Sequence, residues 1–235
     1  MLPPFSEHSH AHPSRPGAAE RRCAPATASH ALGGRYLAKL ESRKPFSPEA
    51  RAAFEALPGH LRTYEANRDI VAEGERPHVS CFVDSGLVSR YKSLPDGGRQ
   101  IVAIHIAGDM VDLQSALLIV ADHAIRTHTR TNIVQFAHAD LLRVAGEYPE
   151  IARAFWFDTL VDASIFREWT VNLGRRSARE RTAHLLLELA WKLHAAGLMN
   201  GDSFELPISQ IDLADALGFR RFTSTGPCNG CGASG

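Results

Sequence analysis

Residues 63–136 constrain the fold most strongly, because turn residues interrupt this stretch roughly every 8 to 12 residues. Turn signals surround Gly74, Gly86 and Gly98, and short apolar or β-branched runs lie between them. Regularly spaced short strands are typical of antiparallel sandwiches and barrels. With helical patterns on both sides, the predicted fold class is α+β. The expected strands are residues 69–71, 79–83, 87–91, 100–106 and 127–136.

A helical pattern precedes this β region. From Tyr36 to about Leu61, apolar residues recur on one helical face, and Ser47 followed by Pro48 and Glu49 is a good helix start.

A long helix is predicted after the β region, over residues 148–174. One seam of this helix, with alternating steps of four and three residues, is mainly large and apolar, although Thr159 and Asp162 interrupt it. Such a seam needs a partner, and a second copy of the chain in a symmetric dimer is the simplest one. Packing onto the β region is the alternative. The candidate interface residues are Phe155, Thr159, Asp162, Phe166, Trp169 and Leu173.

The C-terminal part begins with the capping box Ser177-Ala-Arg-Glu180, which predicts a second amphipathic helix. Residues 204–208 predict a short strand. Residues 208–218 then predict a short helix that Ser209 caps and Gly218 ends. Small Ala214 suits the first helix of a helix-turn-helix, because the second helix must approach it closely.

In this order, the segments resemble the Crp/Fnr family of bacterial transcription regulators, over roughly residues 46–218. The resemblance rests on the phrases IVAEGE, FVDSGLVSRYKSLPDGGRQIVAIHIAGDMVDL, ARERTAHLLLELAWKL and LPISQIDLADALG. It implies a sensory jelly roll like that of cyclic-nucleotide-binding domains, a dimerisation helix and a winged helix-turn-helix. It also implies a homodimeric DNA-binding regulator, for which RNA polymerase is a further candidate partner.

Composition and the resemblance together predict five parts of the chain. They are a disordered tail (1–34), the sensory domain (35–147), the dimerisation helix (148–174), a partial winged helix-turn-helix (175–219) and an aberrant tail (220–235).

The effector of the sensory domain is unknown. Family members that bind a cyclic nucleotide hold the ribose with a glutamate and the phosphate with an arginine. Here Asp112 or Gln114 stands near the glutamate place, His123 falls near the arginine place, and Arg126 is off register. Histidine lacks the permanent charge and two-pronged geometry of arginine, so cyclic AMP binding is not expected. The candidate effector-pocket residues are Gly108, Asp112, Gln114, His123 and Arg126.

No cofactor is expected. Cys23 and Cys81 alone cannot ligate the iron–sulfur cluster that other members carry. A cupin-like metal enzyme is the minor alternative, but the β region has no His-x-His pair, so neither a metal nor an enzymatic activity is expected. The histidines of the β region are His105, His123, His128 and His138.

The end of the chain departs from the family pattern. After Gly218 the sequence FRRFTSTGPCNGCGASG does not predict the recognition helix. Back-translation with a one-base shift can give PSVHVDRTLQRLRRE, a basic amphipathic pattern, so we infer a frameshift near Phe219 or Arg220, natural or introduced in sequencing. Sequencing the coding DNA through this point decides the matter.

The expected DNA contacts are therefore to the backbone. Ser209 and Gln210 match family positions that approach phosphates, and Arg220 and Arg221 add nonspecific attraction. Weak, nonspecific DNA binding is predicted, and a dimeric effector-sensing module without DNA binding is the alternative.

The charge composition does not indicate a nucleic-acid partner. The 26 basic and 26 acidic side chains balance, so any electrostatic footprint for nucleic acid must be local. The cysteines make no disulfide framework, and no apolar run approaches the roughly 20 residues that span a bilayer. A cytoplasmic protein without a membrane partner is expected.

Overall fold

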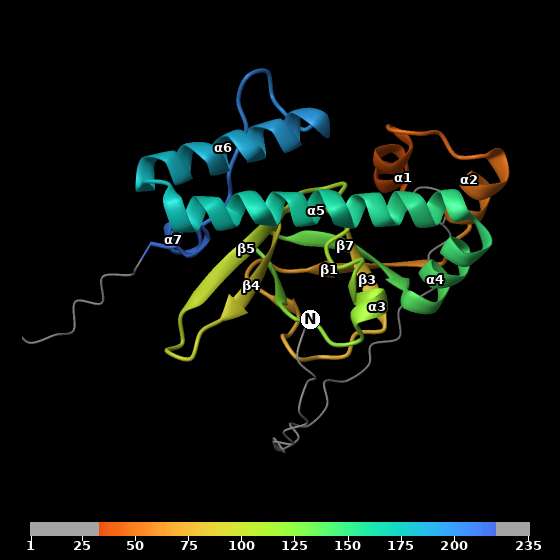
Figure 1. Cartoon of the computed structure of the whole chain (residues 1–235), viewed down its shortest axis with the longest axis horizontal. Helices are drawn as coiled ribbons and strands as arrows, with labels where there is room; N and C mark the ends of the chain where they lie inside the picture. Colours follow the sequence, from red (N-terminus) through yellow and green to blue (C-terminus); the bar gives the residue numbers. More distant parts are fainter. Residues whose placement is uncertain (1–32, 220–235) are drawn as a thin grey trace, which may run out of the picture.

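Two antiparallel β-sheets form the centre of the computed structural model, which describes residues 33–219 (Figure 1). One sheet has the strand order β1-β7-β3, and the other has the order β2-β6-β4-β5. The predicted α+β class with an antiparallel jelly roll is confirmed. The strands are β1 (Gly59–Tyr64), β2 (Asp69–Val71), β3 (Val79–Ser85), β4 (Val88–Ser93), β5 (Arg99–His105), β6 (Ala124–Thr127) and β7 (Thr131–Ala137).

The single strand expected over residues 127–136 is wrong, because the chain changes sheets there. Strand β6 belongs to the four-stranded sheet and β7 to the three-stranded sheet, with a corner at residues 128–130. Gly86 packs against this corner with a φ of 100°, and a Cβ on it would lie 2.4 Å from the Thr131 hydroxyl. The corner therefore requires glycine at this position.

Short helices cover one end of the roll. Ser47 caps α2 as expected, since its hydroxyl accepts the backbone N–H of Ala50. The helical pattern ends earlier than predicted, because β1 already begins at Gly59. Helix α4, which was not predicted from the sequence, buries Leu141 and Val144. These helices are α1 (Gly34–Glu41), α2 (Pro48–Glu55), α3 (Ser115–Leu118) and α4 (His138–Glu147).

Helix α5 (Pro149–Arg175) confirms the predicted long helix and runs across the roll (Figure 1). At its N-terminal half, Ile151 and Phe155 join a core cluster with α1, α2 and α4. At its C-terminal half, Trp169 joins a second cluster with β4, β5 and the helices that follow. One helix thus connects two hydrophobic cores.

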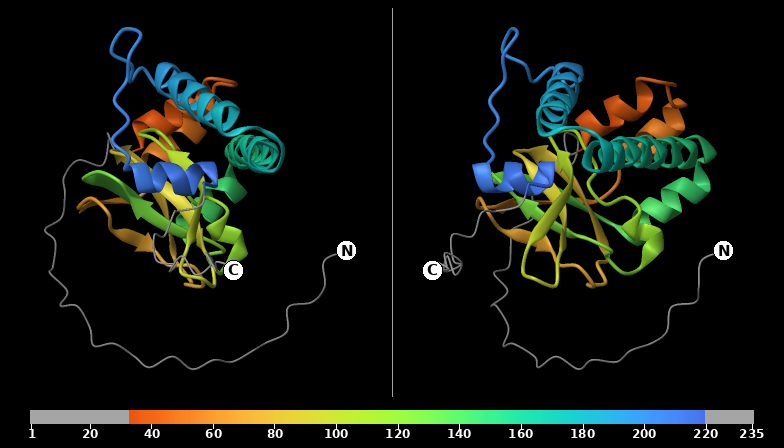
Figure 2. Two further views of the ribbon diagram at one scale, coloured as in Figure 1. Left: turned by 90° about the vertical axis from the view of Figure 1, so that its left-hand side faces the viewer. Right: turned by 60° about the vertical axis from the view of Figure 1, so that its left-hand side comes forward.

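The chain after α5 folds back onto the roll. Helix α6 (Ala178–Ala195) begins with the predicted capping box of Ser177 and Glu180. Residues 204–208 then descend as an extended segment to helix α7 (Gln210–Leu217), which lies beside the roll (Figure 2). The strand predicted at 204–208 is wrong, because no strand within residues 33–219 pairs with this segment. Its side chains instead pack into the cluster around β5 and α7.

Candidate effector pocket and DNA-contact surfaces

A buried arginine from β4 bridges the roll and α5. Arg90 is 1% exposed, and its Nε donates a hydrogen bond to His105 Nε2 at 2.8 Å. Its Nη2 pairs with the Asp162 carboxylate of α5, and its guanidinium lies 4.9 Å from the centroid of the Phe166 ring. This arginine is the charge that holds the middle of α5 onto the roll.

The Arg90 cluster extends to α1 and α6 through Asp109. Lys39 of α1 and Lys192 of α6 each place Nζ 3.0 Å from an oxygen of Asp109. Although burial opposes ionisation, the two lysines hold the pKa of Asp109 well below its usual range. Burial and the Arg90 charge lower the pKa of His105 to about 4, so this imidazole is neutral at physiological pH. The network ties four parts of the chain together.

The five candidate effector-pocket residues do not surround one common space. Asp112 is buried, its Oδ1 accepts the N–H of Cys81 at 2.6 Å, and its Oδ2 has no hydrogen-bond partner. Burial raises the pKa of Asp112 to about 7. Gly108 takes a positive φ of 103° at a turn and lines a large cavity beside α5, which the other four candidates do not line.

The remaining three candidates lie apart from that cavity. His123 Nδ1 lies 2.6 Å from the carboxylate of neighbouring Asp122, and Arg126 pairs with Asp69 at 3.1 Å. Gln114 precedes α3 as its N-cap residue, without a side-chain capping bond. Arg90 and Asp162, which do meet, were not among the candidates. The available signal was Asp162, a charge inside the mainly apolar seam of the long helix.

Most of the predicted dimer-interface residues pack against their own chain. We call Phe155, Asp162 and Trp169 the inward face of α5, since Phe155 and Trp169 are 8% and 5% exposed in the two clusters and Asp162 binds Arg90. These three residues therefore pack onto their own β region, which was the alternative to a dimer interface. Of the rest, Phe166 contacts Arg90, Leu173 lies against Gly218, and the hydroxyl of Thr159 donates to its own helix.

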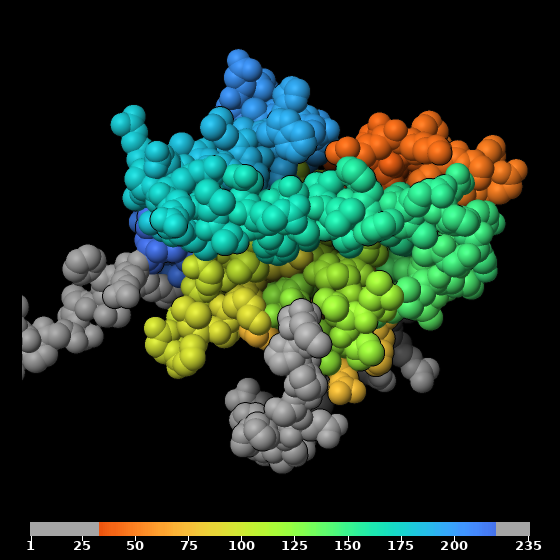
Figure 3. Space-filling model, viewed as in Figure 1, coloured from red at the N-terminus to blue at the C-terminus, as the bar shows by residue number. Residues whose placement is uncertain are grey.

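The opposite side of α5 carries large apolar side chains that face solvent. Trp156, Leu160 and Val171 are 67%, 50% and 43% exposed, and we call them the outward face. Their spacing of four and eleven residues places them on one side of the helix. Figure 3 shows α5 uncovered along the front of the molecule.

The predicted helix at residues 208–218 is confirmed as α7, but it is docked on the roll. Arg99 of β5 donates to Asp212 at 2.7 Å and to Asp215 at 2.9 Å. The Ser209 hydroxyl accepts the N–H of Asp212 and donates to the same carboxylate at 2.6 Å. Ser209 and Gln210 are exposed, whereas Arg220 and Arg221 lie outside the described residues.

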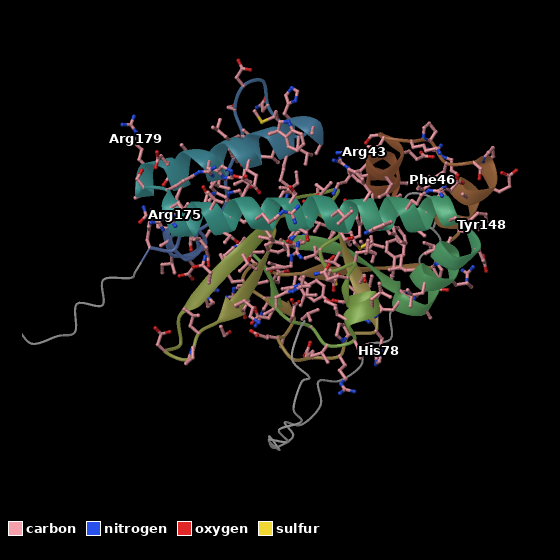
Figure 4. All side chains as sticks on the ribbon, in the orientation of Figure 1. Arg43, Phe46, His78, Tyr148, Arg175 and Arg179 are labelled. Atoms are coloured by element: carbon pink, nitrogen blue, oxygen red, sulfur yellow. The ribbon has the colours of Figure 1, made fainter. Side chains whose placement is uncertain are left out.

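Two exposed arginines lie at the same end of the molecule as α7. Arg175 ends α5 and Arg179 is in the first turn of α6, and Figure 4 shows both at the end of the structure where α7 lies. Neither arginine was predicted as a DNA contact, although Arg175 lies in the run Gly174-Arg-Arg176 between the two predicted helices. They supply the local positive charge that the balanced composition hides.

Within residues 33–219, no group of three or more His, Cys, Asp or Glu side chains is placed to hold a metal ion. Cys81 is buried, and burial raises the pKa of its thiol well above the usual value. None of the described helices combines the length and apolar character needed to cross a membrane. The predicted tails, 1–34 and 220–235, lie outside the described residues apart from Gly33 and Gly34.

A jelly roll followed by a long helix is the architecture of the cyclic-nucleotide-binding fold. Residues 61–148 match the family model of the cyclic nucleotide-binding domain. A probable transcriptional activator of Rhizobium leguminosarum bv. viciae is 32% identical over 158 residues, which are 67% of this chain and 64% of that protein. The nitrogen fixation regulation protein FixK of Bradyrhizobium diazoefficiens is 36% identical over 135 residues, which are 57% of this chain and 55% of FixK.

The solved structure of FixK2 from Bradyrhizobium japonicum is 30% identical, with a TM-score of 0.64 over 69% of this chain and 79% of that one. The chain belongs to the Crp/Fnr family of transcription regulators. It spans a little under two thirds of the length of the activator from Rhizobium leguminosarum and about half of FixK from Bradyrhizobium diazoefficiens.

Proposed function

We propose that this chain is a DNA-binding transcription regulator of the Crp/Fnr type that acts in the cytoplasm as a homodimer and has no enzymatic activity. The observation that carries the proposal is the end of the molecule formed by α7. There the exposed Ser209 and Gln210 begin the capped helix α7, and Arg175 and Arg179 lie towards its other end, where Gly218 lies against Leu173 of α5. Helix N-termini and arginines are the groups that contact DNA phosphates.

The proposed dimer contact lies on the outward face of α5. Trp156, Leu160 and Val171 are large, apolar and exposed, and a second copy of the same helix would cover all three at once. Phe155 and Trp169 would support this contact from behind, because they fix the helix on its own roll.

The proposed sensor does not take cyclic AMP in the usual manner. Between the roll and α5, Arg90 pairs with Asp162 and His105 rather than facing an open anion site. Asp112, near the expected ribose-binding place, is buried and bonded to the backbone of Cys81. The effector is therefore of another kind, and neither an iron–sulfur cluster nor a metal is expected as cofactor.

Contacts through α7 and the arginines would position the protein without reading base sequence. We therefore expect weak, salt-sensitive binding to duplex DNA with little preference between sequences. Fluorescence anisotropy with a labelled duplex, titrated at several salt concentrations, tests this expectation.

A matched set of charge-removing variants tests the surface itself. Arg175→Gln and Arg179→Gln are each expected to weaken binding and to reduce the slope of log affinity against log salt by about 1. Arg143→Gln, on α4 at the other end of α5, removes the same charge and is expected to change nothing. Equal behaviour of the three variants, or no DNA binding by the parent chain at low salt, would contradict the proposal and favour a sensing module without DNA binding.

A further inference from the structure

A cavity of about 780 Å³ lies between α1, α5 and α6 and has no place in the proposed DNA contact. Its floor is the turn after β5, including Gly108 and Asp109. Figure 3 shows the molecule hollowed above α5, between α6 and α1. The volume falls within the range of pockets that hold small organic molecules, about 300–1,000 Å³.

The charges at the floor of the cavity are paired within the chain. Lys39 lies 3.0 Å from Asp109 and 3.2 Å from Asp158, and Lys192 lies 3.0 Å from Asp109. Asp158 also accepts a hydrogen bond from the Tyr36 hydroxyl. This network leaves no charge at the floor that calls for a ligand counter-ion.

The rim is different, because its cations exceed its anions. Arg35, Arg43, Lys44 and Arg153 line the cavity, and none forms an ion pair with another residue in the range 33–219. Glu150 is the one acidic group on this rim, and hydrogen bonds from Ser47 together with the charges of Lys44 and Arg153 lower its pKa. Its carboxylate is therefore ionised and offsets one of the four positive charges. The rim therefore carries surplus positive charge above an internally neutralised floor.

The walls supply apolar surface. Phe157 of α5 and Trp191 of α6 line the cavity while remaining 41% and 69% exposed, and Val161 and Ile165 lie along α5 between them. The Arg43 guanidinium lies 4.1 Å from the centroid of the Phe157 ring, and Figure 4 shows Arg43 on the side of α1 that faces α6. Cationic and apolar surfaces thus meet at one mouth.

We infer that this cavity binds an amphipathic organic anion, whose acidic head lies at the arginines of the rim and whose apolar body lies along Phe157, Val161 and Trp191. A carboxylate suits the head, because guanidinium groups donate paired hydrogen bonds to it. The inference concerns a binding site and holds whether or not the chain binds DNA. Because the walls come from three helices, an occupied cavity would fix α1, α5 and α6 relative to one another.

Isothermal titration calorimetry with three small probes separates the contributions of head and body. Octanoate carries both, octan-1-ol carries only the apolar body, and acetate carries only the charge. We expect octanoate to bind at one site per chain and about tenfold more tightly than octan-1-ol, since a charge-assisted hydrogen bond contributes about 1.5–3 kcal/mol. Acetate should give no saturable heat. Equal affinities for octanoate and octan-1-ol would overturn the inference.

Variants then place the site. Arg43→Gln and Arg153→Gln should each weaken octanoate binding severalfold, whereas Arg143→Gln, an exposed arginine on α4, should not. Val161→Trp should fill the cavity and abolish octanoate binding. If this variant does not fold, Ala195→Trp is used instead, because Ala195 is exposed on α6 and also lines the cavity. If both arginine variants bound octanoate with the affinity of the parent chain, the inference would be wrong. It would also be wrong if Ala195→Trp still bound octanoate and changed only its oligomeric state.

Discussion

The two sides of helix α5 carry similar apolar side chains but have different surroundings. On the inward face, Phe155 and Trp169 are buried in two clusters, and Asp162 between them is paired with Arg90. On the outward face, Trp156 and Leu160 are exposed. Only the inward face can form the ion pair with Arg90, so this pair distinguishes the side of the helix that meets the roll. Burying the other side would leave Arg90 without its carboxylate, which costs about 3–5 kcal/mol.

The largest expected effect comes from removing the charge on the inward face. Asp162→Asn leaves Arg90 buried without its ionised partner, so we expect a loss of about 3 kcal/mol in the free energy of unfolding. Urea denaturation followed by circular dichroism measures it. Glu168→Gln is the matched control on the same helix, because its carboxylate is exposed and pairs with Arg176 at 3.0 Å.

The control should lose no more than about 0.5 kcal/mol, as exposed ion pairs contribute little. If the two variants were equally stable, the inward face would not depend on Arg90, and the comparison between the two sides of α5 would fail.

A smaller effect is expected where the inward face meets α7. Arg99→Gln removes both charged bonds to Asp212 and Asp215, so the docking of α7 on β5 should weaken by about 2 kcal/mol. Hydrogen exchange of the α7 amides should become correspondingly faster, while exchange in the N-terminal half of α5 stays unchanged. Unaltered exchange in α7 would mean that the apolar cluster alone holds this helix.

The smallest expected effect is a change in the pH dependence of stability. The pKa of Asp112 is raised by burial to about 7, so its contribution to stability is present at low pH and is lost as pH rises towards 7. The pKa of His105 is lowered by burial and by Arg90 to about 4, so its contribution is present above the unfolded value and is lost as pH falls towards 4. The two slopes oppose each other between these values.

Replacing either Asp112 or His105 should therefore expose the pH dependence of stability that the other residue causes. Asp112→Asn should make the free energy of unfolding rise with pH between 4.5 and 6.5, and His105→Gln should make it fall, each by about 1 kcal/mol per pH unit relative to the parent chain. Urea titrations across this range provide the measurement, and slopes of the same sign in both variants would be inconsistent with the assigned directions.

Features with a local cause could be predicted from the sequence. The caps at Ser47, Ser177 and Ser209 depend on residues three positions away, and all three form. The long helix α5 follows from periodicity within its own segment. The strand turns at glycines follow in the same way.

Features that depend on distant partners could not be predicted. The Arg90–Asp162 pair joins residues 72 positions apart, so Asp162 looked like an interruption of an apolar seam. The partner of the apolar seam could not be predicted for the same reason. Periodicity shows which residues share a side of α5, but it does not show what covers that side. The corner at residues 128–130 and the unpaired segment 204–208 likewise depend on sheet partners that a single segment does not reveal.

If the outward face of α5 contacts a second copy of the chain, the oligomeric state must depend on this face. Sedimentation velocity should find the 25.7 kDa chain as a dimer. Leu160→Asp on the outward face should be monomeric with an unchanged circular dichroism spectrum. Leu142→Asp, which charges a similarly exposed leucine on α4, should remain dimeric. A monomeric parent chain, or a Leu160→Asp variant that still dimerises, would contradict the account.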